Sequence, residues 1–448
     1  MVFWLGTSSA SVGHHLHAFT EPIVMKNTVI LAALFSAFLA GCNQLETPES
    51  NIEEKESSFH ATFVDMTFDG VLYASNDWNP ERTIEQQLLY TIGQLNGNNA
   101  VGRLDKVEVT DLEIEKIDGD YRFDYTVTMP VAWGKTSPVP ETYEFVLPIS
   151  TRYQDLTRFA EKYGKDCVSY SAHDVDSGSM WYYYRPGMTF CKLDEIDVMK
   201  TVASVAPSTL QTSGKYPEYD DVWKDGRLEV VAIFGRASED KPADTDIGTR
   251  NFRNFIRKIE NVVPNAVSTP AEYEGNLGVD ITDMHIEGQL DDERKISVTV
   301  LVVDNVRTAG SDFQERYRSL TPTADLIIYN GHAGLGRNIK ALASRGDWVA
   351  EQYVIVFMNG CDTYAYVDDA LYAAHREVNP DDPIGTRYVD LVTNAMPAYF
   401  RDMTEASMAM VDALSNPDKP LTYDEIFANI ADDQLVLVTG EDDNVYEP

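Results

Sequence analysis

Three nearly uninterrupted apolar runs in the second half of the chain set the strongest limits on its fold. They are LEVVAIF at residues 228–234, ADLIIY at 324–329 and YVIVFM at 353–358. Runs of this length and composition are typical of strands buried on both faces, as in parallel sheets covered by helices. A glycine follows each run within two positions. Because ligands bind outside the carboxyl ends of such strands, the residues after the runs are candidates for a functional site.

Helical and strand patterns alternate along the rest of this region. We expect strands at residues 279–286 and 296–303, and helices at residues 248–259, 311–320 and 338–344. Residues 421–439 are expected to form a helix and then a strand that completes the sheet. This alternation predicts an α/β domain over residues 225–448, with a largely parallel sheet flanked by helices.

The chain before residue 208 has a different pattern. The Asn-Pro pair at 79–80 is a favourable start for a helix, and the Asp-Gly-Asp sequence at 118–120 joins two alternating runs into an expected β-hairpin. A second helix is expected at residues 153–163, where Gly164 ends it. These signals predict an α+β domain over residues 59–207, separated from the α/β domain by an aperiodic stretch.

An export signal begins at Met25 rather than at Met1. Lys26 precedes an apolar run over residues 29–40, and small residues lead directly to Cys42. A charged start, an apolar centre and small residues before a cleavage point are typical of a secretory signal, and the run is too short for a stable membrane span.

The sequence Leu-Ala-Gly-Cys that ends this signal resembles the lipobox of bacterial lipoproteins. The resemblance implies that Cys42 carries the lipid anchor, and Asn43 after it implies retention at the outer rather than the inner membrane. We therefore interpret Met25 as the true start of translation, so that residues 1–24 result from a start site assigned too far upstream. Residues 25–41 are then the signal peptide and residues 42–58 an acidic tether.

The charge of the chain excludes some partners. Its formal net charge is −36, which would repel nucleic acid and anionic lipid surfaces. Hydrophobic residues make up 44% and aromatic residues 11%, which are the values of folded domains rather than of disordered chains.

The cysteines divide into two kinds. Outside the cytoplasm, Cys167 and Cys191 could form a disulfide, which leaves Cys361 as an odd thiol. The segment between the paired cysteines contains the aromatic run at 181–184, which we expect to pack beneath the loop rather than to bind a sugar or a peptide. The acidic string at 174–179 has some likeness to a calcium loop but lacks its closing Glu, so a polar turn is favoured.

His332 and Cys361 are the candidate catalytic residues. Each follows a glycine at the end of an apolar run, and they are 29 positions apart. If the two strands are parallel neighbours, both side chains emerge at one edge of the sheet, where an imidazole can activate a thiol. His285 and His375 are instead expected at the surface.

An apolar block ending in His, followed by an apolar block ending in a small residue and Cys, resembles the caspase-like cysteine peptidases, the clan of caspases, gingipains, clostripain and legumains. The likeness covers residues 225–448. It implies that Cys361 is the nucleophile, that His332 is the general acid and base, and that the N–H groups of Ala333 and Cys361 line an oxyanion hole. The family generally has Gly where Ala333 stands; alanine can still donate its N–H, provided that the turn there does not need positive φ. Asp362 could shape the pocket or only form a turn.

Nucleotide-binding alternatives fit this loop poorly. Residues 331–336 have the glycine spacing of a P-loop, but Arg337 and Asn338 stand where Lys and Ser or Thr are needed. The dinucleotide fingerprint fails at Ile339, where its third glycine should be.

Two functions therefore remain open. The first is a cysteine endopeptidase anchored to the cell envelope, acting on a peptide or protein substrate; the family resemblance implies no metal or other cofactor. The second is a non-catalytic envelope lipoprotein that uses the same fold for binding or assembly.

Overall fold

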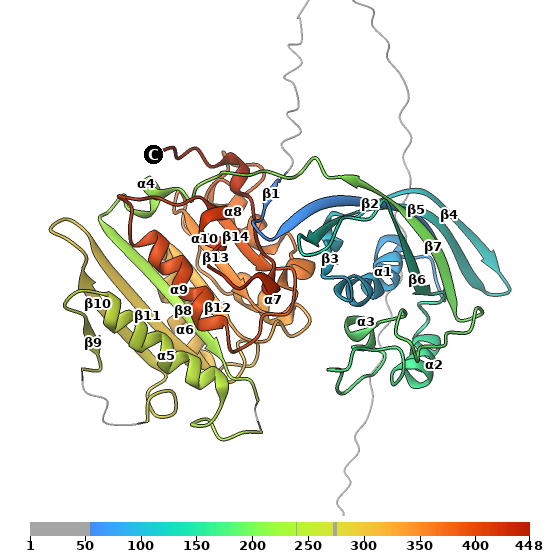
Figure 1. Ribbon diagram of the computed structural model, residues 1–448, viewed down its shortest axis with the longest axis horizontal. Helices are drawn as coiled ribbons and strands as arrows, with labels where there is room; N and C mark the ends of the chain where they lie inside the picture. Colours follow the sequence, from blue (N-terminus) through green and yellow to red (C-terminus); the bar gives the residue numbers. More distant parts are fainter. Residues whose placement is uncertain (1–53, 239, 272–275) are drawn as a thin grey trace, which may run out of the picture. The chain divides into compact units, whose positions relative to one another are not determined.

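The structure is a computed structural model that describes residues 54–238, 240–271 and 276–448 (Figure 1). The predicted signal peptide, Cys42 and most of the expected tether lie outside the described residues. In this described part, no helix is both long enough and apolar enough to cross a membrane.

One sheet of the described chain has nine strands in the order β1-β15-β14-β13-β12-β8-β11-β10-β9. The five central strands are parallel: β14 (Val389–Asn394), β13 (Val354–Asn359), β12 (Leu326–Asn330), β8 (Arg227–Gly235) and β11 (Lys295–Val303). The marginal strands pair antiparallel: β10 (Asp283–Gln289) and β9 (Val267–Thr269) on one side, β15 (Val436–Thr439) and β1 (Glu56–Ser57) on the other. The three apolar runs are thus confirmed as buried neighbours, but the sheet is mixed rather than largely parallel.

Helices cover both faces of this sheet. Residues of β8 alternate between two buried clusters, with Val231 and Ile233 in one and Val230 and Ala232 in the other. The first cluster includes residues of α6 (Ser311–Leu320), α7 (Arg337–Ala343) and α8 (Ala370–Val378). The second includes residues of α5 (Ile247–Val262), α9 (Met403–Leu414) and α10 (Tyr423–Phe427). Burial on both sides explains why these strands show no polar alternation.

The second sheet is antiparallel, in the order β3-β5-β2-β7-β6, with β4 also paired to β5. Its strands are β2 (Ala61–Ala74), β3 (Ala100–Gly102), β4 (Glu108–Ile117), β5 (Asp120–Gly134), β6 (Thr142–Pro148) and β7 (Val198–Pro207). The expected hairpin is confirmed as β4–β5, and Asp118 and Gly119 both have positive φ at its turn. This sheet and its helices form the α+β part of the chain.

Three helices accompany the antiparallel sheet: α1 (Pro80–Asn96), α2 (Tyr153–Tyr163) and α3 (Met180–Tyr183). The first two are confirmed as predicted, with the Asn79 side chain accepting the N–H of Arg82 at the start of α1. The aromatic run forms α3 and the residue after it, and Trp181 and Tyr184 are buried in the same cluster as Cys167. Packing beneath the disulfide loop is therefore confirmed for these two rings.

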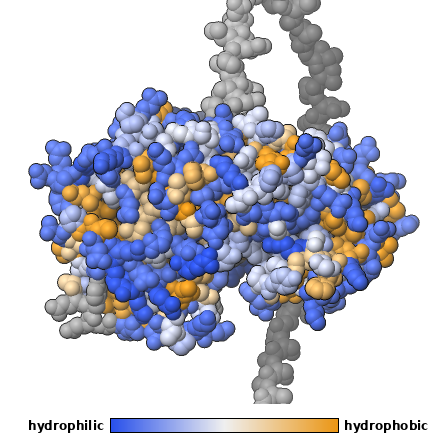
Figure 2. Space-filling model, viewed as in Figure 1, coloured by the Kyte–Doolittle hydropathy of each residue, from blue (hydrophilic) through white to orange (hydrophobic). Residues whose placement is uncertain are grey.

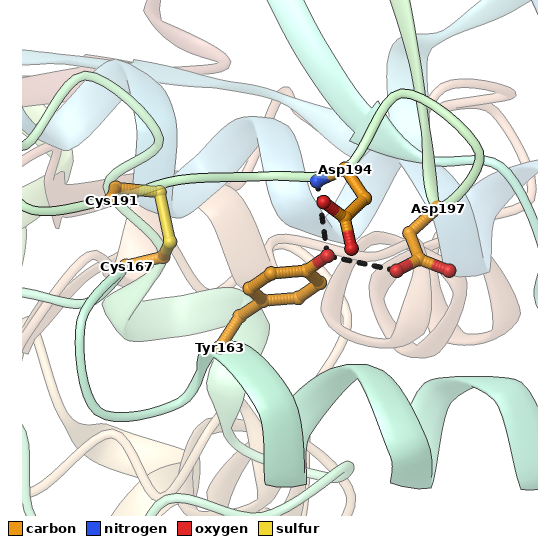
Figure 3. The surroundings of a disulfide bond; sticks show 5 residues. All are labelled: Tyr163, Cys167, Cys191, Asp194 and Asp197. Atoms are coloured by element: carbon orange, nitrogen blue, oxygen red, sulfur yellow. Dashed lines mark hydrogen bonds between the residues drawn. A yellow bond between two sulfur atoms is a disulfide. The ribbon is translucent and has the colours of Figure 1, made fainter.

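The predicted disulfide between Cys167 and Cys191 is present. Figure 3 shows how the adjoining chain is held: Tyr163, in the last turn of α2, donates its hydroxyl to Asp197 at 2.8 Å and accepts the N–H of Asp194 at 3.0 Å. The bond and this tyrosine together fix both ends of the segment that carries α3.

The expected tether ends earlier than Ser58. Glu54, Glu56 and Ser57 are buried, and β1 adds to the edge of β15. Glu54 and Glu56 both face the buried guanidinium of Arg103, at 2.8 Å and 3.6 Å, and Asp105 lies 2.9 Å from it. These residues therefore belong to the folded part of the chain. Their polar, acidic character predicted a flexible tether, because the sequence does not show that Arg103 pairs with them.

Other expectations need correction. His375 is 1% exposed in α8 rather than at the surface; its ring lies 5.0 Å from that of Trp348, and burial lowers its pKa to about 4. The strand expected at 279–286 begins only at Asp283, and β14 and α9 were not predicted at all. His285 is partly exposed and contacts Thr299 at 3.3 Å.

Buried carboxyl groups make the stability of the fold depend on pH. Burial raises the pKa of Asp325 to about 8, and those of Asp390 and Glu56 to about 7. Each group binds a proton more tightly when folded, so its stabilising effect is present at low pH and is lost as pH rises through the folded pKa. We expect the free energy of unfolding to rise by a few kcal/mol, as an order of magnitude, between pH 8.5 and pH 5.5.

Chemical denaturation at the two pH values measures this change. The Asp390→Asn variant should show a smaller difference between them, because one of the titrating groups is gone. A wild-type chain more stable at pH 8.5 than at pH 5.5 would contradict the prediction. Acid also neutralises part of the net charge of −36, which weakens the repulsion between carboxylates and so raises the free energy of unfolding further. Figure 2 shows hydrophilic residues over most of the face in view.

Candidate functional site

The carboxyl ends of β8, β12 and β13 lie at one edge of the nine-stranded sheet. β11 and β12 lie on opposite sides of β8, so the order in which strands are added to the sheet reverses beside β8. Parallel sheets commonly bind ligands at such a topological switch point. Asn330 and Asn359 are register partners at the ends of β12 and β13. His332 and Cys361, each two residues further along, therefore leave the sheet on neighbouring strands, as their spacing predicted.

The two strand ends are also joined by side chains. Asn359 donates its amide to Asn330 at 2.8 Å, and Asn330 exchanges hydrogen bonds with Ser407 of α9. All three side chains are buried beneath the loops that carry the candidate residues. Because an unsatisfied buried amide is costly, this network favours one relative placement of the two strand ends.

The loop after β12 is fixed by its own side chains. Tyr329 and Asn338 both donate to the carbonyl oxygen of His332, each at 2.8 Å. Residues 334–336 have φ of 60°, 53° and 82°, in the left-handed region that glycine adopts at least cost. Ala333 is not among the residues with positive φ. Alanine at this position is therefore accommodated without the strain that its departure from the family pattern suggested.

The imidazole of His332 is held by a backbone carbonyl from a third strand end. Its Nε2 lies 3.0 Å from the carbonyl oxygen of Ala237, two residues after β8, and its ring meets the edge of Phe400 at 5.1 Å. A carbonyl only accepts hydrogen bonds, so Nε2 carries the proton. Nδ1 is then the nitrogen with a free lone pair, which is what a general base requires.

Asp246 holds the segment that presents this carbonyl. Its carboxylate is 1% exposed and accepts the N–H of Ala237 at 3.0 Å and that of Ser238 at 3.1 Å. It also accepts the N–H groups of Gly248 and Thr249 as the N-cap of α5. One buried acid thus ties the start of α5 to the residue that orients His332.

Cys361 lies on a loop that touches the His332 loop directly. A Cβ built on Gly360 would stand 2.8 Å from the carbonyl oxygen of Gly331 and 3.3 Å from the nitrogen of Ala333, so a side chain there would force the loops apart. The next residue after the thiol, Asp362, has φ of 51°, and Thr363 donates to the carbonyl oxygen of Met358 at 2.7 Å. The loop therefore turns sharply and folds back onto its own strand.

The backbone N–H groups of Ala333 and Cys361 are the candidate oxyanion donors. Within the described residues, neither donates to another residue. The contact at Gly360 places the Ala333 nitrogen against the residue that precedes Cys361. The N–H of Cys361 faces the sulfur of its own residue. Two donors on touching loops that no other residue occupies are what a developing negative charge on a carbonyl oxygen needs.

The thiol itself lies in an unreactive environment. Its Sγ contacts the carbonyl oxygen of Ala398 at 3.7 Å, and the side chain is only partly exposed. Burial, and then the charge of Asp362, raise the pKa of Cys361 to about 12. No hydrogen bond joins Cys361 to His332 in the described chain, since each uses a separate backbone carbonyl. The group is therefore a thiol at neutral pH in this arrangement.

Asp362 points away from solvent, toward the α+β part of the chain. Its carboxyl is completely buried and accepts the hydroxyl of Tyr182 in α3 at 2.7 Å. Burial raises the pKa of Asp362 to about 6, although Tyr182, Asn96 and the charge of Arg185 favour its ionised form. Trp181, the neighbour of that tyrosine, meets the ring of Tyr366 at 6.2 Å. The aromatic run and the loop of Cys361 are thus in direct contact.

A cleft of about 760 Å³ borders the two loops. It is lined by residues of α1, by Trp181 of α3, by Leu335 and Gly336 after β12, and by Tyr366 after β13. Its walls carry charges of both signs, among them Glu85 and Arg337. Cys361 and His332 do not line it. The cleft therefore offers room beside both loops but does not reach the thiol.

Sequence reasoning found the two candidate residues and missed the groups around them. Ala237, Asp246 and Phe400 carry no pattern that links them to His332. Tyr182 was recognised only as part of a packed aromatic run. In the residues that the structure describes, no three His, Cys, Asp or Glu side chains are placed to hold a metal ion.

Comparisons with known proteins add no assignment to this geometry. No family model matches the chain, and a search of curated proteins finds no similar sequence.

Proposed function

We propose that the chain is a cysteine endopeptidase that resembles the caspase-like clan and is anchored to the cell envelope through Cys42. The observation that carries the proposal is the placement of His332 and Cys361 at equivalent positions on neighbouring parallel strands. Three further features support it: the imidazole tautomer set by Ala237, the touching loops, and the two unused N–H donors. The envelope location rests on the signal and lipobox patterns alone.

The chemistry would proceed in two steps. In the first, His332 takes the thiol proton at Nδ1, and the Cys361 thiolate attacks the peptide carbonyl carbon. The N–H groups of Ala333 and Cys361 stabilise the oxyanion, and the imidazolium gives its proton to the leaving amine. In the second step, His332 deprotonates a water that hydrolyses the thioester, which releases the acid and restores the thiol.

Labelling of Cys361 tests this assignment. We expect a peptidyl chloromethyl ketone to alkylate Cys361 in the full chain, and the His332→Ala variant to react about 10²–10⁴-fold more slowly, since a general base is lost. Mass spectrometry of the Cys361 peptide gives the rate, and iodoacetamide serves as the reagent without a peptide. The ratio between the two proteins is the criterion, not the absolute rate.

Equal rates with and without His332→Ala, measured both in the wild type and in a Tyr182→Phe chain whose Cys361 loop is less tightly held, would exclude the peptidase. The non-catalytic envelope lipoprotein would then be the remaining function. His285→Ala is a suitable control, because that imidazole is partly exposed on β10, with its Nδ1 3.3 Å from the hydroxyl of Thr299.

A further inference from the structure

α3 is held rigidly against the rest of the α+β domain. A Cβ on Gly93 of α1 would stand 2.3 Å from the carbonyl oxygen of Trp181, so the two backbones are in close contact. Arg185 donates to the carbonyl oxygens of Gly93, Tyr182 and Tyr184. A helix of four residues has little stability of its own, and these contacts supply it.

The disulfide is part of the same support. Val168, next to Cys167, forms a β-bridge with Tyr184, and Arg185 donates its N–H to the carbonyl oxygen of Cys167 at 2.8 Å. Ser169 likewise donates to the carbonyl oxygen of Tyr183 at 2.8 Å. The bond to Cys191 therefore fixes the strand on which the end of α3 rests.

From this support, Tyr182 reaches the loop of the candidate nucleophile. Its hydroxyl donates to Asp362 at 2.7 Å. A hydrogen bond from the same side chain lowers the pKa of the Cys361 thiol, but by less than the Asp362 charge raises it. Burial, together with the adjacent carboxylate, raises the pKa of Tyr182 well above its usual value, so its hydroxyl remains a donor. The contact is thus a charged hydrogen bond in a buried place, where such bonds are strong.

We propose that Tyr182 is a latch: by holding Asp362, it keeps Cys361 in a resting state that the protein must release before it can act. This inference rests on the proposed function, since it describes the regulation of the same site. With the latch closed, the buried carboxylate lies next to the sulfur and opposes formation of a thiolate. The cleft beside the two loops also stops at Trp181.

Withdrawal of α3 would change both conditions. Water would reach Asp362 and Cys361, so the burial that disfavours the thiolate would be relieved. The carboxylate would be screened by solvent rather than facing the sulfur in a buried space. The ionisable groups that surround the thiol, and whose titration any pH profile will include, are Asp362, Tyr182, Tyr183, Arg185, Tyr329, Tyr366 and His332.

Two substitutions open the latch by different routes. Tyr182→Phe removes the hydroxyl and keeps the ring. Asp362→Asn removes the charge but keeps the shape of the side chain, and Asn tolerates the positive φ at this position. Tyr183→Phe is the matched control, because it makes the same change one residue away, where the hydroxyl faces His173 at 3.4 Å.

The experiment follows alkylation of Cys361 by iodoacetamide in the full chain between pH 6 and pH 11. We expect Asp362→Asn to react at least about tenfold faster than the wild type at pH 8, with the midpoint of the profile moved to lower pH. Tyr182→Phe should be accelerated by a smaller factor, because its hydroxyl also makes a hydrogen bond that favours the thiolate. Tyr183→Phe should react at the wild-type rate at pH 8, because the raised pKa of Tyr183 keeps its hydroxyl neutral there. Reduction of the Cys167–Cys191 bond by a phosphine should also accelerate labelling of the Cys361 peptide.

Wild-type profiles in both Tyr182→Phe and Asp362→Asn would overturn the latch, and so would an equal acceleration in Tyr183→Phe. If Tyr182→Phe fails to fold, Asp362→Asn and the reduced wild type decide alone. Iodoacetamide needs no peptidase site, so the two proposals can fail separately. Faster alkylation in Asp362→Asn, with no dependence of peptidyl labelling on His332, would keep the latch and remove the peptidase.

Discussion

Replacement of Cys361 by alanine is expected to abolish hydrolysis of a peptide library, a loss on the order of 10⁴-fold or more. Without the sulfur there is no covalent intermediate, and the loops retain only their oxyanion donors. His332→Ala should lose nearly as much, since residues that act as a unit are not additive. The double variant should therefore be no worse than Cys361→Ala alone. Release of fluorophore from quenched peptides measures the rates.

The assay is best made in the Tyr182→Phe chain as well as in the wild type, because a closed latch would hide activity. His285→Ala is expected to retain the parent rate in both backgrounds. Hydrolysis that persists undiminished in Cys361→Ala would show that the activity belongs to another site or to a contaminant. It would end the assignment of this thiol as the nucleophile.

Replacement of Arg103 by methionine is expected to lower the free energy of unfolding by about 3–5 kcal/mol at pH 8. The guanidinium is 2% exposed and is the shared partner of Glu54, Glu56 and Asp105. Removing it leaves two buried carboxylates without their shared cation: Glu54 keeps Lys106, and Glu56 keeps only the neutral Tyr364 hydroxyl. The loss should be smaller at pH 5, where the carboxyl groups accept protons. Urea denaturation at both pH values measures it.

Arg122→Met is the matched control for this change. That guanidinium is 38% exposed and faces Asp124 at the surface, so we expect its removal to change the free energy of unfolding far less than the removal of Arg103 does. If the two variants unfold alike, the buried cluster does not stabilise the fold as the geometry suggests.

The strong local patterns of the sequence predicted the framework of the fold. The three apolar runs, the helix that begins at Pro80 and the hairpin at 118–120 all rest on signals contained within a few residues. The wrong predictions concern residues whose burial depends on contacts with segments that are distant in the sequence. His375 was expected at the surface because an exposed face is the default for a histidine in a helix-like stretch, yet it is buried and its ring packs against Trp348 from another segment.

In the candidate site, too, some residues could be predicted from local sequence patterns and others are revealed only by the folded chain. His332 and Cys361 could be found because each follows a buried strand and a glycine, and parallel pairing then brings them together. Ala237 and Asp246 act through a backbone carbonyl and an N-cap, which leave no distinctive side-chain pattern in a sequence. Tyr182 is 180 positions from Asp362, so only the folded chain reveals their contact.

The pairing of β1 with β15 has a consequence for how the chain is made. The first described strand pairs with the last one, so this edge of the sheet cannot close until β15 has been synthesised. The antiparallel domain can form early, as domains emerge in order from the ribosome. The pairing of β1 with β15 joins segments that are far apart in the sequence, and such non-local contacts form slowly. Until it forms, β15 presents an open edge of the kind that invites pairing with other chains, which makes late folding the stage most prone to aggregation.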